Sequence, residues 1–130
     1  MPYSVDDLVG KVVLIAEDQY LLADSIEAAV VSAGGSVQGP FPSVGETMEQ
    51  LATAETLPDA ATLNIRLQDG DSYPVADELT RLGIPYVFAS ATDLATLPKR
   101  FSRVAMVPKP YAPSQIVLAL TTLLDRSGVD

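Results

Sequence analysis

The stretch DAATLNIRLQDGD, residues 59–71, decides how the rest of this 130-residue chain is interpreted. An apolar run within it is typical of a buried β-strand, and that run ends at a polar residue, Asn64. A loop rich in Gly and Asp follows directly. A buried strand that ends in a polar side chain before a loop points to a site, so we expect the chemistry of the chain to centre on Asn64.

Composition limits the class of protein. With 48% hydrophobic and 19% charged residues, the chain suits one domain that spans residues 1–130. It contains no Cys, which excludes disulfides, thiol chemistry and Cys-based metal sites. The first ten residues carry two acids and no basic segment, and no apolar run approaches the roughly 18 residues of a membrane span. We therefore expect a soluble cytoplasmic protein without a membrane segment.

The charge balance argues against nucleic acid as a partner. The net charge is -9, from 8 Lys and Arg against 17 Asp and Glu, and this opposes attraction to phosphate backbones. Lys99, Arg100 and Arg103 cluster in the sequence. Three cations on an acidic domain are more typical of a solvated helix face than of a nucleic-acid site.

Strand-like and helical patterns alternate along the chain. Gly83 is placed to end a helix, and Ser43 with Glu46 has the S-x-x-E spacing of a capping box that begins one. Pro98 interrupts a weaker segment, residues 93–102, where we expect a short or kinked helix. Five strands are expected: 11–16, 36–38, the apolar run that ends at Asn64, 85–89 and 104–107. Four helices are expected, at 22–33, 44–51, 75–82 and 116–124.

This alternation predicts an α/β fold. Strands separated by helices are joined by right-handed crossovers, which give a doubly wound, five-stranded parallel sheet covered on both faces. In open sheets of this kind, ligands bind outside the carboxyl ends of the strands. The polar residues at those ends are therefore the candidate site residues.

Four of the five expected strands end on polar groups: Glu17 and Asp18, Asn64, Ser90, and Lys109. Each has an ordinary interpretation on its own, as a helix-dipole partner, a turn former or a solvated surface lysine. A parallel sheet, however, brings all four strand ends to one edge. Together the residues predict a shallow cleft lined by two acids, an amide, a hydroxyl and an ammonium group.

Five short segments carry a resemblance to a known family: LIAED (14–18), PDAATLN (58–64), LQDGD (67–71), VFASA (87–91) and KPY (109–111). In this order and at these separations, they resemble the receiver domains of two-component response regulators. The resemblance covers nearly the whole chain and implies a (βα)5, flavodoxin-like receiver fold. The chain is similar to stand-alone alphaproteobacterial receivers whose fourth strand ends in Phe-Ala-Thr-Gly-Tyr, but Ser90, Ala91 and Thr92 replace the last three residues of that motif.

The resemblance implies a role for each site residue. Glu17 and Asp18 would help to hold Mg²⁺ together with the backbone carbonyl of Arg66, because a hard divalent cation prefers oxygen ligands. Ser90 would hydrogen-bond an incoming phosphoryl group. Lys109 would neutralise the charge of that group, and the Lys-Pro bond that follows is often cis in the family.

The phosphoacceptor of the family is an Asp at the end of the third strand, which takes a phosphoryl group from a histidine kinase. This chain has Asn64 there. A neutral amide oxygen is a far poorer nucleophile than a carboxylate, so we expect no normal phospho-aspartate. The loss of one acid also predicts weaker Mg²⁺ binding at Glu17, Asp18 and Asn64. Asp69 and Asp71 lie beyond the strand end and are not expected to replace the missing acid.

Two further features concern switching and partners. Met106 occupies the fifth-strand position where many family members carry a Tyr or Phe that swings inward on activation, and a Met there is typical of packing. The resemblance also implies a homodimer or effector face formed by the region of Lys99 to Arg103 and the last helix, and this region has the mixed basic and aromatic character of interfaces. A buried Phe101 beside solvated cations is the other interpretation. Because the sequence ends at Asp130, we expect a stand-alone module without an output domain.

Three functions remain open. The chain is a pseudo-receiver recognised without phosphorylation, a phosphoacceptor with an Asp to Asn change at position 64, or an unrelated small metal-dependent α/β enzyme. The persistence of the acidic pair, Ser90 and Lys109 favours the second, and the drift at Ala91, Thr92 and Met106 favours the first. The third lacks a nucleophile, a His and a Gly-rich phosphate loop. In the first two, the partner is a histidine kinase or another two-component protein, and no catalysis is expected.

Overall fold

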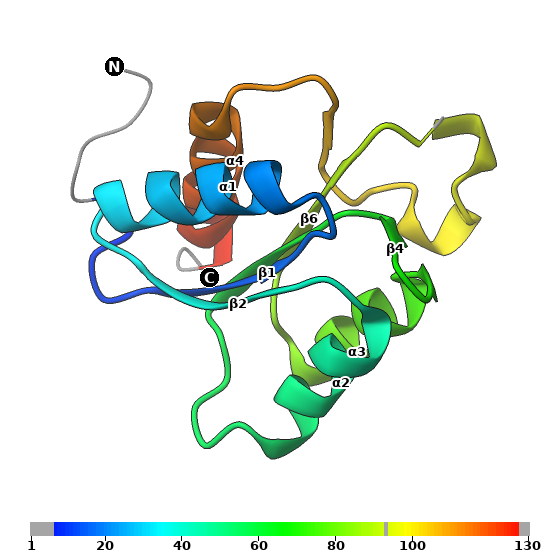
Figure 1. The fold of residues 1–130 in the computed structure, drawn as a ribbon, viewed down its shortest axis with the longest axis horizontal. Coiled ribbons are helices and arrows are strands. Elements are labelled where there is room, and N and C mark those ends of the chain that lie inside the picture. Colours follow the sequence, from blue (N-terminus) through cyan, green and yellow to red (C-terminus); the bar gives the residue numbers. More distant parts are fainter. Residues whose placement is uncertain (1–6, 93, 128–130) are drawn as a thin grey trace.

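A five-stranded sheet organises the structure. The computed structural model describes residues 7–92 and 94–127. In this part of the chain the sheet has the strand order β2-β1-β3-β6-β7, and neighbouring strands are parallel (Figure 1). The predicted doubly wound parallel sheet is therefore confirmed. The strands are β1 (Val12–Ala16), β2 (Ser36–Phe41), β3 (Ala60–Leu63), β6 (Tyr86–Ser90) and β7 (Met106–Pro108).

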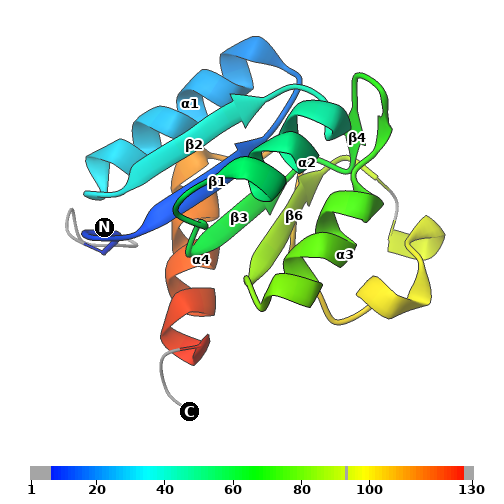
Figure 2. The ribbon, with the colours of Figure 1, turned by 90° about the horizontal axis from the view of Figure 1, so that it is seen from below.

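Helices cover both faces of this sheet. Figure 2 shows α1 (Tyr20–Ser32) and α4 (Pro113–Ser127) on one face, and α2 (Val44–Thr53) and α3 (Tyr73–Leu82) on the other. None of the helices in the described residues is long and apolar enough to cross a membrane.

Strand β1 shows why the apolar runs are continuous. Leu14 belongs to the core cluster that contains Phe88 and lies under α2 and α3. The next residue, Ile15, belongs to the cluster that contains Ile26 of α1 and Ile116 of α4. Successive side chains of a strand point to opposite faces, so a strand between two helical layers must be apolar at both.

The predicted helix signals are present at the expected residues. The Ser43 side chain caps α2, because its Oγ accepts a hydrogen bond of 3.1 Å from the backbone N–H of Glu46. The Ser43 hydroxyl in turn donates to the Glu46 carboxylate at 2.9 Å. Gly83 ends α3 at a φ of 74°, in the left-handed region that glycine adopts without steric cost.

Two strand boundaries differ from the prediction by more than one residue. Strand β2 continues to Phe41, through a cis Gly39–Pro40 bond, because Ala16 of β1 pairs with Phe41 beyond an irregularity in the ladder. Strand β7 begins at Met106 rather than at 104. The backbone N–H of Val104 is instead bonded to the Phe101 carbonyl at 3.0 Å and closes a turn.

The predicted short or kinked helix around Pro98 is two separate 3₁₀ turns. They are η1 (Leu94–Thr96) and η2 (Lys99–Phe101), with Pro98 as the residue that precedes η2. Proline lacks the N–H that a continuous helix needs, which explains the break. Asp93, the first residue of the predicted segment, lies outside the described residues.

Candidate functional site

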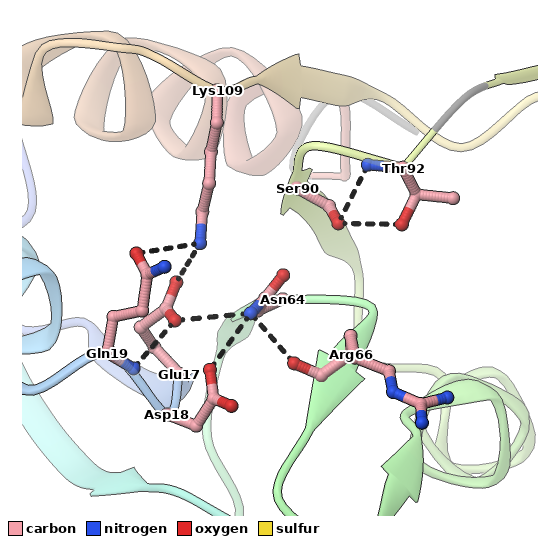
Figure 3. Close-up of polar contacts among 8 residues, drawn as sticks. All are labelled: Glu17, Asp18, Gln19, Asn64, Arg66, Ser90, Thr92 and Lys109. Carbon is pink, nitrogen blue, oxygen red and sulfur yellow. Dashed lines mark hydrogen bonds and ion pairs between the residues drawn. The ribbon is translucent and has the colours of Figure 1, made fainter.

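The carboxyl ends of β1, β3, β6 and β7 bring the expected polar residues to one edge of the sheet (Figure 3). Asp18, Asn64, Ser90 and Lys109 line an open cavity of about 400 Å³. Glu17 lies against this group, and its side chain is only 2% exposed. The structure thus places all five side chains together, although they come from four separate parts of the sequence.

Asn64 is the centre of the site. It follows β3 directly and is 7% exposed. Its Nδ2 donates to Glu17 Oε2 and to Asp18 Oδ1, both at 3.2 Å, and to the backbone carbonyl of Arg66 at 2.8 Å. The opposite orientation of the amide would set its oxygen against three other oxygens, so these acceptors fix which way the group points. The Asn64 carbonyl oxygen points away from them (Figure 3).

Lys109 faces the buried acid of the pair. Its Nζ lies 3.2 Å from Glu17 Oε1 and 3.3 Å from Gln19 Oε1, to which it donates a hydrogen bond. The contact with Glu17 has the distance of an ion pair but not the alignment of a hydrogen bond, so the attraction is Coulombic. Burial raises the pKa of Glu17, and the Gln19 N–H and Lys109 partly offset this rise.

The Ser90 hydroxyl is held by its own loop. Ser90 is 2% exposed, and its Oγ lies 3.0 Å from Thr92 Oγ1 and accepts a bond of 3.3 Å from the Thr92 N–H. The Ser90 carbonyl accepts a hydrogen bond of 3.1 Å from the Lys109 N–H, and the Lys109–Pro110 bond that follows is cis, the form that the resemblance implied.

The two acids after Asn64 point elsewhere. Asp71 pairs with the exposed guanidinium of Arg66 at 3.3 Å, within the small hairpin of β4 (Arg66–Leu67) and β5 (Gly70–Asp71). Asp69 accepts hydrogen bonds from the backbone N–H groups of Val44 at 2.6 Å and Gly45 at 3.0 Å. These bonds lower the pKa of Asp69. Both carboxylates are therefore engaged away from the cavity, and neither replaces an acid at position 64.

Sequence reasoning missed two residues of the site, Gln19 and Thr92. Gln19 contacts both Lys109 and Glu17, and Thr92 contacts Ser90. Each lies within two positions of a strand-end residue, which is the only signal in the sequence that could have found them. Their roles depend on where the chain turns after the strand, and polarity alone does not encode that turn.

Several solved structures with the same arrangement of strands and helices are described as response regulators or receiver domains. The response regulator PhyR from Brucella abortus matches with a TM-score of 0.76 and 24% identity over 95% of this chain and 51% of that protein, so the chain spans about half of its length. A response regulator receiver protein from Sinorhizobium medicae matches with a TM-score of 0.74 and 23% identity, over 91% of this chain and 95% of that one. The signal receiver domain of a modulated diguanylate cyclase from Desulfovibrio desulfuricans matches with a TM-score of 0.76 and 25% identity, over 89% and 94%.

This chain has the receiver-domain fold. No protein-family model matches its sequence, and no curated protein matches it. The likeness is therefore one of structure, and the chemistry of the receiver site has to be argued from this chain's own residues.

The Mg²⁺ that the receiver fold implies can be tested against those residues. The Asn64 amide directs its N–H hydrogens at the oxygens of Glu17, Asp18 and Arg66 that would bind the cation. Within 7–92 and 94–127, no group of three or more His, Cys, Asp and Glu side chains is placed to hold a metal. In this arrangement the residues present do not fit a bound Mg²⁺.

Phe101 was expected either in an interface with Lys99, Arg100 and Arg103 or in the core, and the structure places it in the core. Phe101 is 2% exposed and packs between Tyr73, with ring centroids 5.2 Å apart, and Phe88, at 5.6 Å. Its expected place in an exposed aromatic face is therefore wrong, and the alternative of a buried Phe101 is right. Arg100 lies 4.4 Å above the Phe101 ring and forms two hydrogen bonds with Asp77, at 3.0 and 3.1 Å.

Met106 is half-buried and packs against this same core cluster. It thus contributes to the packing of the face that α2 and α3 cover, next to the segment that carries Phe101. A flexible thioether fills such a space without requiring a hydrogen-bond partner, whereas a Tyr hydroxyl would require one.

Proposed function

We propose that this chain is a receiver module of two-component phosphorelay signalling that works without aspartyl phosphorylation, through contact with another protein. One observation carries this proposal. The residue at the acceptor position is Asn64, and its amide nitrogen is bonded to the acidic pair instead of leaving a carboxylate open to the cavity.

The chemistry of phosphoryl transfer supports the proposal. An acyl phosphate forms when a carboxylate oxygen attacks phosphorus, and a neutral amide oxygen is a much weaker nucleophile. The acids next along the chain, Asp69 and Asp71, are engaged by the N-terminus of α2 and by Arg66. Glu17 is buried and faces Lys109. Asp18 is the remaining acid of the cavity, and one of its oxygens accepts from Asn64.

A binding role is consistent with what the chain retains. The chain keeps the receiver-domain fold although the acceptor position holds Asn64. The outer surfaces of its helices and loops can therefore still be recognised by a partner. We propose a histidine kinase or another two-component protein as that partner, bound in the cytoplasm. The chain has no His and no Cys, and we propose no catalytic activity for it.

A second candidate is a phosphoacceptor receiver held inactive by an Asp to Asn change at position 64. It is favoured by the supporting groups that persist around the cavity. The acidic pair, Ser90 and Lys109 are all at the edge of the sheet. If the acceptor carboxylate were restored, these groups would already be close to it.

Intact mass spectrometry after incubation with Mg²⁺ and acetyl phosphate separates the two candidates. The natural chain should gain no phosphate. If Asn64→Asp gains one phosphate and Asn64→Asp with Lys109→Ala gains less, the cavity is functional and the second candidate holds. If Asn64→Asp also gains none, the pseudo-receiver holds. A phosphate on the natural chain would refute both, and peptide mapping would then test Asp18.

The binding role has its own measurement. The phosphotransfer domain of a histidine kinase from the same genome is titrated with the natural chain by calorimetry, with and without acetyl phosphate. We expect the dissociation constant to be unchanged by the phosphodonor, because no phosphate can be added. A dissociation constant that changes with acetyl phosphate would contradict phosphorylation-independent recognition.

A further inference from the structure

We propose that the side-chain amide of Asn64 takes the place of a divalent cation, so that the chain satisfies its own cation-type oxygen cluster and needs no metal. This goes beyond the proposed function, because it concerns what holds the edge of the sheet together and not what the surface binds. It rests on the geometry of the cluster alone.

The cluster consists of three oxygens that converge on one atom. Glu17 Oε2 and Asp18 Oδ1 come from the segment after β1, and the Arg66 carbonyl comes from the start of β4. Two carboxylates and a backbone carbonyl form the kind of hard oxygen set that binds Mg²⁺ or Ca²⁺. Here the atom at the point of convergence is Asn64 Nδ2, at 3.2, 3.2 and 2.8 Å (Figure 3).

The polarity of the amide suits this position. Its two N–H hydrogens carry partial positive charge and must be shared among three acceptors, as a small cation would be shared among its ligands. The hydrogen bond to Glu17 is buried and those to Asp18 and the Arg66 carbonyl are part-buried. An unpaired carboxylate oxygen is costly where water is excluded, so a positive neighbour stabilises this cluster, and Glu17 most of all. Asn64 supplies it from within the chain.

The charge balance of the cluster points the same way. Glu17 and Asp18 carry two formal negative charges, and Lys109, 3.2 Å from Glu17, supplies one positive charge. The net charge is one negative, which hydrogen bonds from Asn64 and the Gln19 N–H can stabilise. An Asp at position 64 would make the net charge two negative and add a further oxygen to the set. Such a cluster would attract a cation more strongly than the cluster in this chain does.

A simpler explanation is that Asn64 weakens metal binding only because an amide supplies one carboxylate ligand fewer than an Asp would. The two explanations predict different effects of Asn64→Ala on metal affinity. Alanine adds no ligand, so under the simpler account it cannot improve metal binding. If the amide stands in for the cation, alanine vacates the place where the three oxygens converge, and a divalent cation should then enter. The proposal therefore predicts a gain of metal affinity on deletion of a polar side chain.

The test compares the natural chain with Asn64→Ala by thermal denaturation and calorimetry in the presence of Mg²⁺ and of Mn²⁺. We expect no saturable rise in melting temperature for the natural chain. For Asn64→Ala we expect a saturable rise, with a metal dissociation constant at least about tenfold lower than that of the natural chain. The double variant Asn64→Ala with Asp18→Asn is the control and should lose the gain. Equal affinity in the natural chain and Asn64→Ala would overturn the proposal.

A second measurement needs no variant. In ¹⁵N-labelled natural chain, Mn²⁺ bound at these oxygens would broaden the Asn64 side-chain NH₂ resonances first, because that nitrogen lies within 3.2 Å of all three. We expect no selective broadening as Mn²⁺ is added. Selective loss of this pair of resonances would show that the cation displaces or joins the amide, and the proposal would be wrong even if Asn64→Ala failed to fold.

Discussion

Replacing Lys109 by Met should destabilise the protein through Glu17. Met keeps most of the length and the apolar stem of the side chain, so the change mainly removes the charge. The Glu17 side chain is 2% exposed and that of Lys109 is 15% exposed, with 3.2 Å between Nζ and Oε1. Deleting one partner of a buried ion pair costs about 3–5 kcal/mol, because the other charge is left without compensation.

The expected cost here is smaller than that range. Glu17 keeps two other donors, the Gln19 N–H at 3.0 Å and Asn64 Nδ2 at 3.2 Å. Lys109 also retains some contact with water, which reduces the strength of the pair. We therefore expect Lys109→Met to lower the free energy of unfolding by about 2 kcal/mol.

Urea denaturation at neutral pH checks this value as part of a double-mutant cycle. Glu17→Gln should be destabilising alone, but the double variant should be more stable than the sum of the two losses predicts, with a coupling energy of about 1–2 kcal/mol. Lys99→Met is the matched control, because Lys99 is exposed and its loss should change stability by less than about 0.5 kcal/mol. A coupling energy near zero would mean that Lys109 is not committed to Glu17, and our account of the cavity would fail.

Three further variants and two controls, Phe101→Leu and Asp71→Asn, test the supporting structure. Phe101→Ala should lower the free energy of unfolding by about 3–5 kcal/mol in urea, since the ring is buried, and Phe101→Leu should cost much less. Ser43→Ala should cost about 1 kcal/mol through loss of the α2 cap. Asp69→Asn should lower the melting temperature at neutral pH but not at strongly acid pH, whereas Asp71→Asn should change little. Because the folded state lowers the pKa of Asp69, its stabilisation is complete above the unfolded-state pKa and is lost as pH falls through the lowered one; a pH-independent difference would contradict this.

The fold was predictable because its signals repeat along the chain. The central strands β1, β3 and β6 lie between two helical layers and are mostly apolar, and α2 and α3 each carry a local signal at one end, Ser43 and Gly83. The meeting of the polar residues at one edge followed from topology, since parallel strands end on the same side. None of this required knowledge of an interatomic distance.

The features that the sequence did not predict are contacts between residues that are distant in the sequence. The extension of β2 to Phe41 depends on where β1 resumes its pairing after Leu14. The contact between Lys109 Nζ and Glu17 Oε1, at 3.2 Å, depends on where the two side chains lie in the folded chain. Asn64 and Glu17 are 47 residues apart in the sequence, and nothing in composition or periodicity says which end of the Asn64 amide faces the acids.

The position of Asn64 explains how an altered site is compatible with an unaltered fold. The two core clusters lie on the faces of the sheet, while the acids, the amide and Lys109 lie at its edge. Exchange of a carboxylate for an amide therefore leaves the buried apolar surface unchanged and only alters which atoms donate and accept. The amide nitrogen donates to Glu17 Oε2, Asp18 Oδ1 and the Arg66 carbonyl, so each of these three oxygens has a hydrogen-bond partner. Under the function proposed above, the chain can thus lack a phosphoacceptor carboxylate while the three oxygens around Asn64 Nδ2 keep a hydrogen-bond donor, as a module working by recognition alone requires.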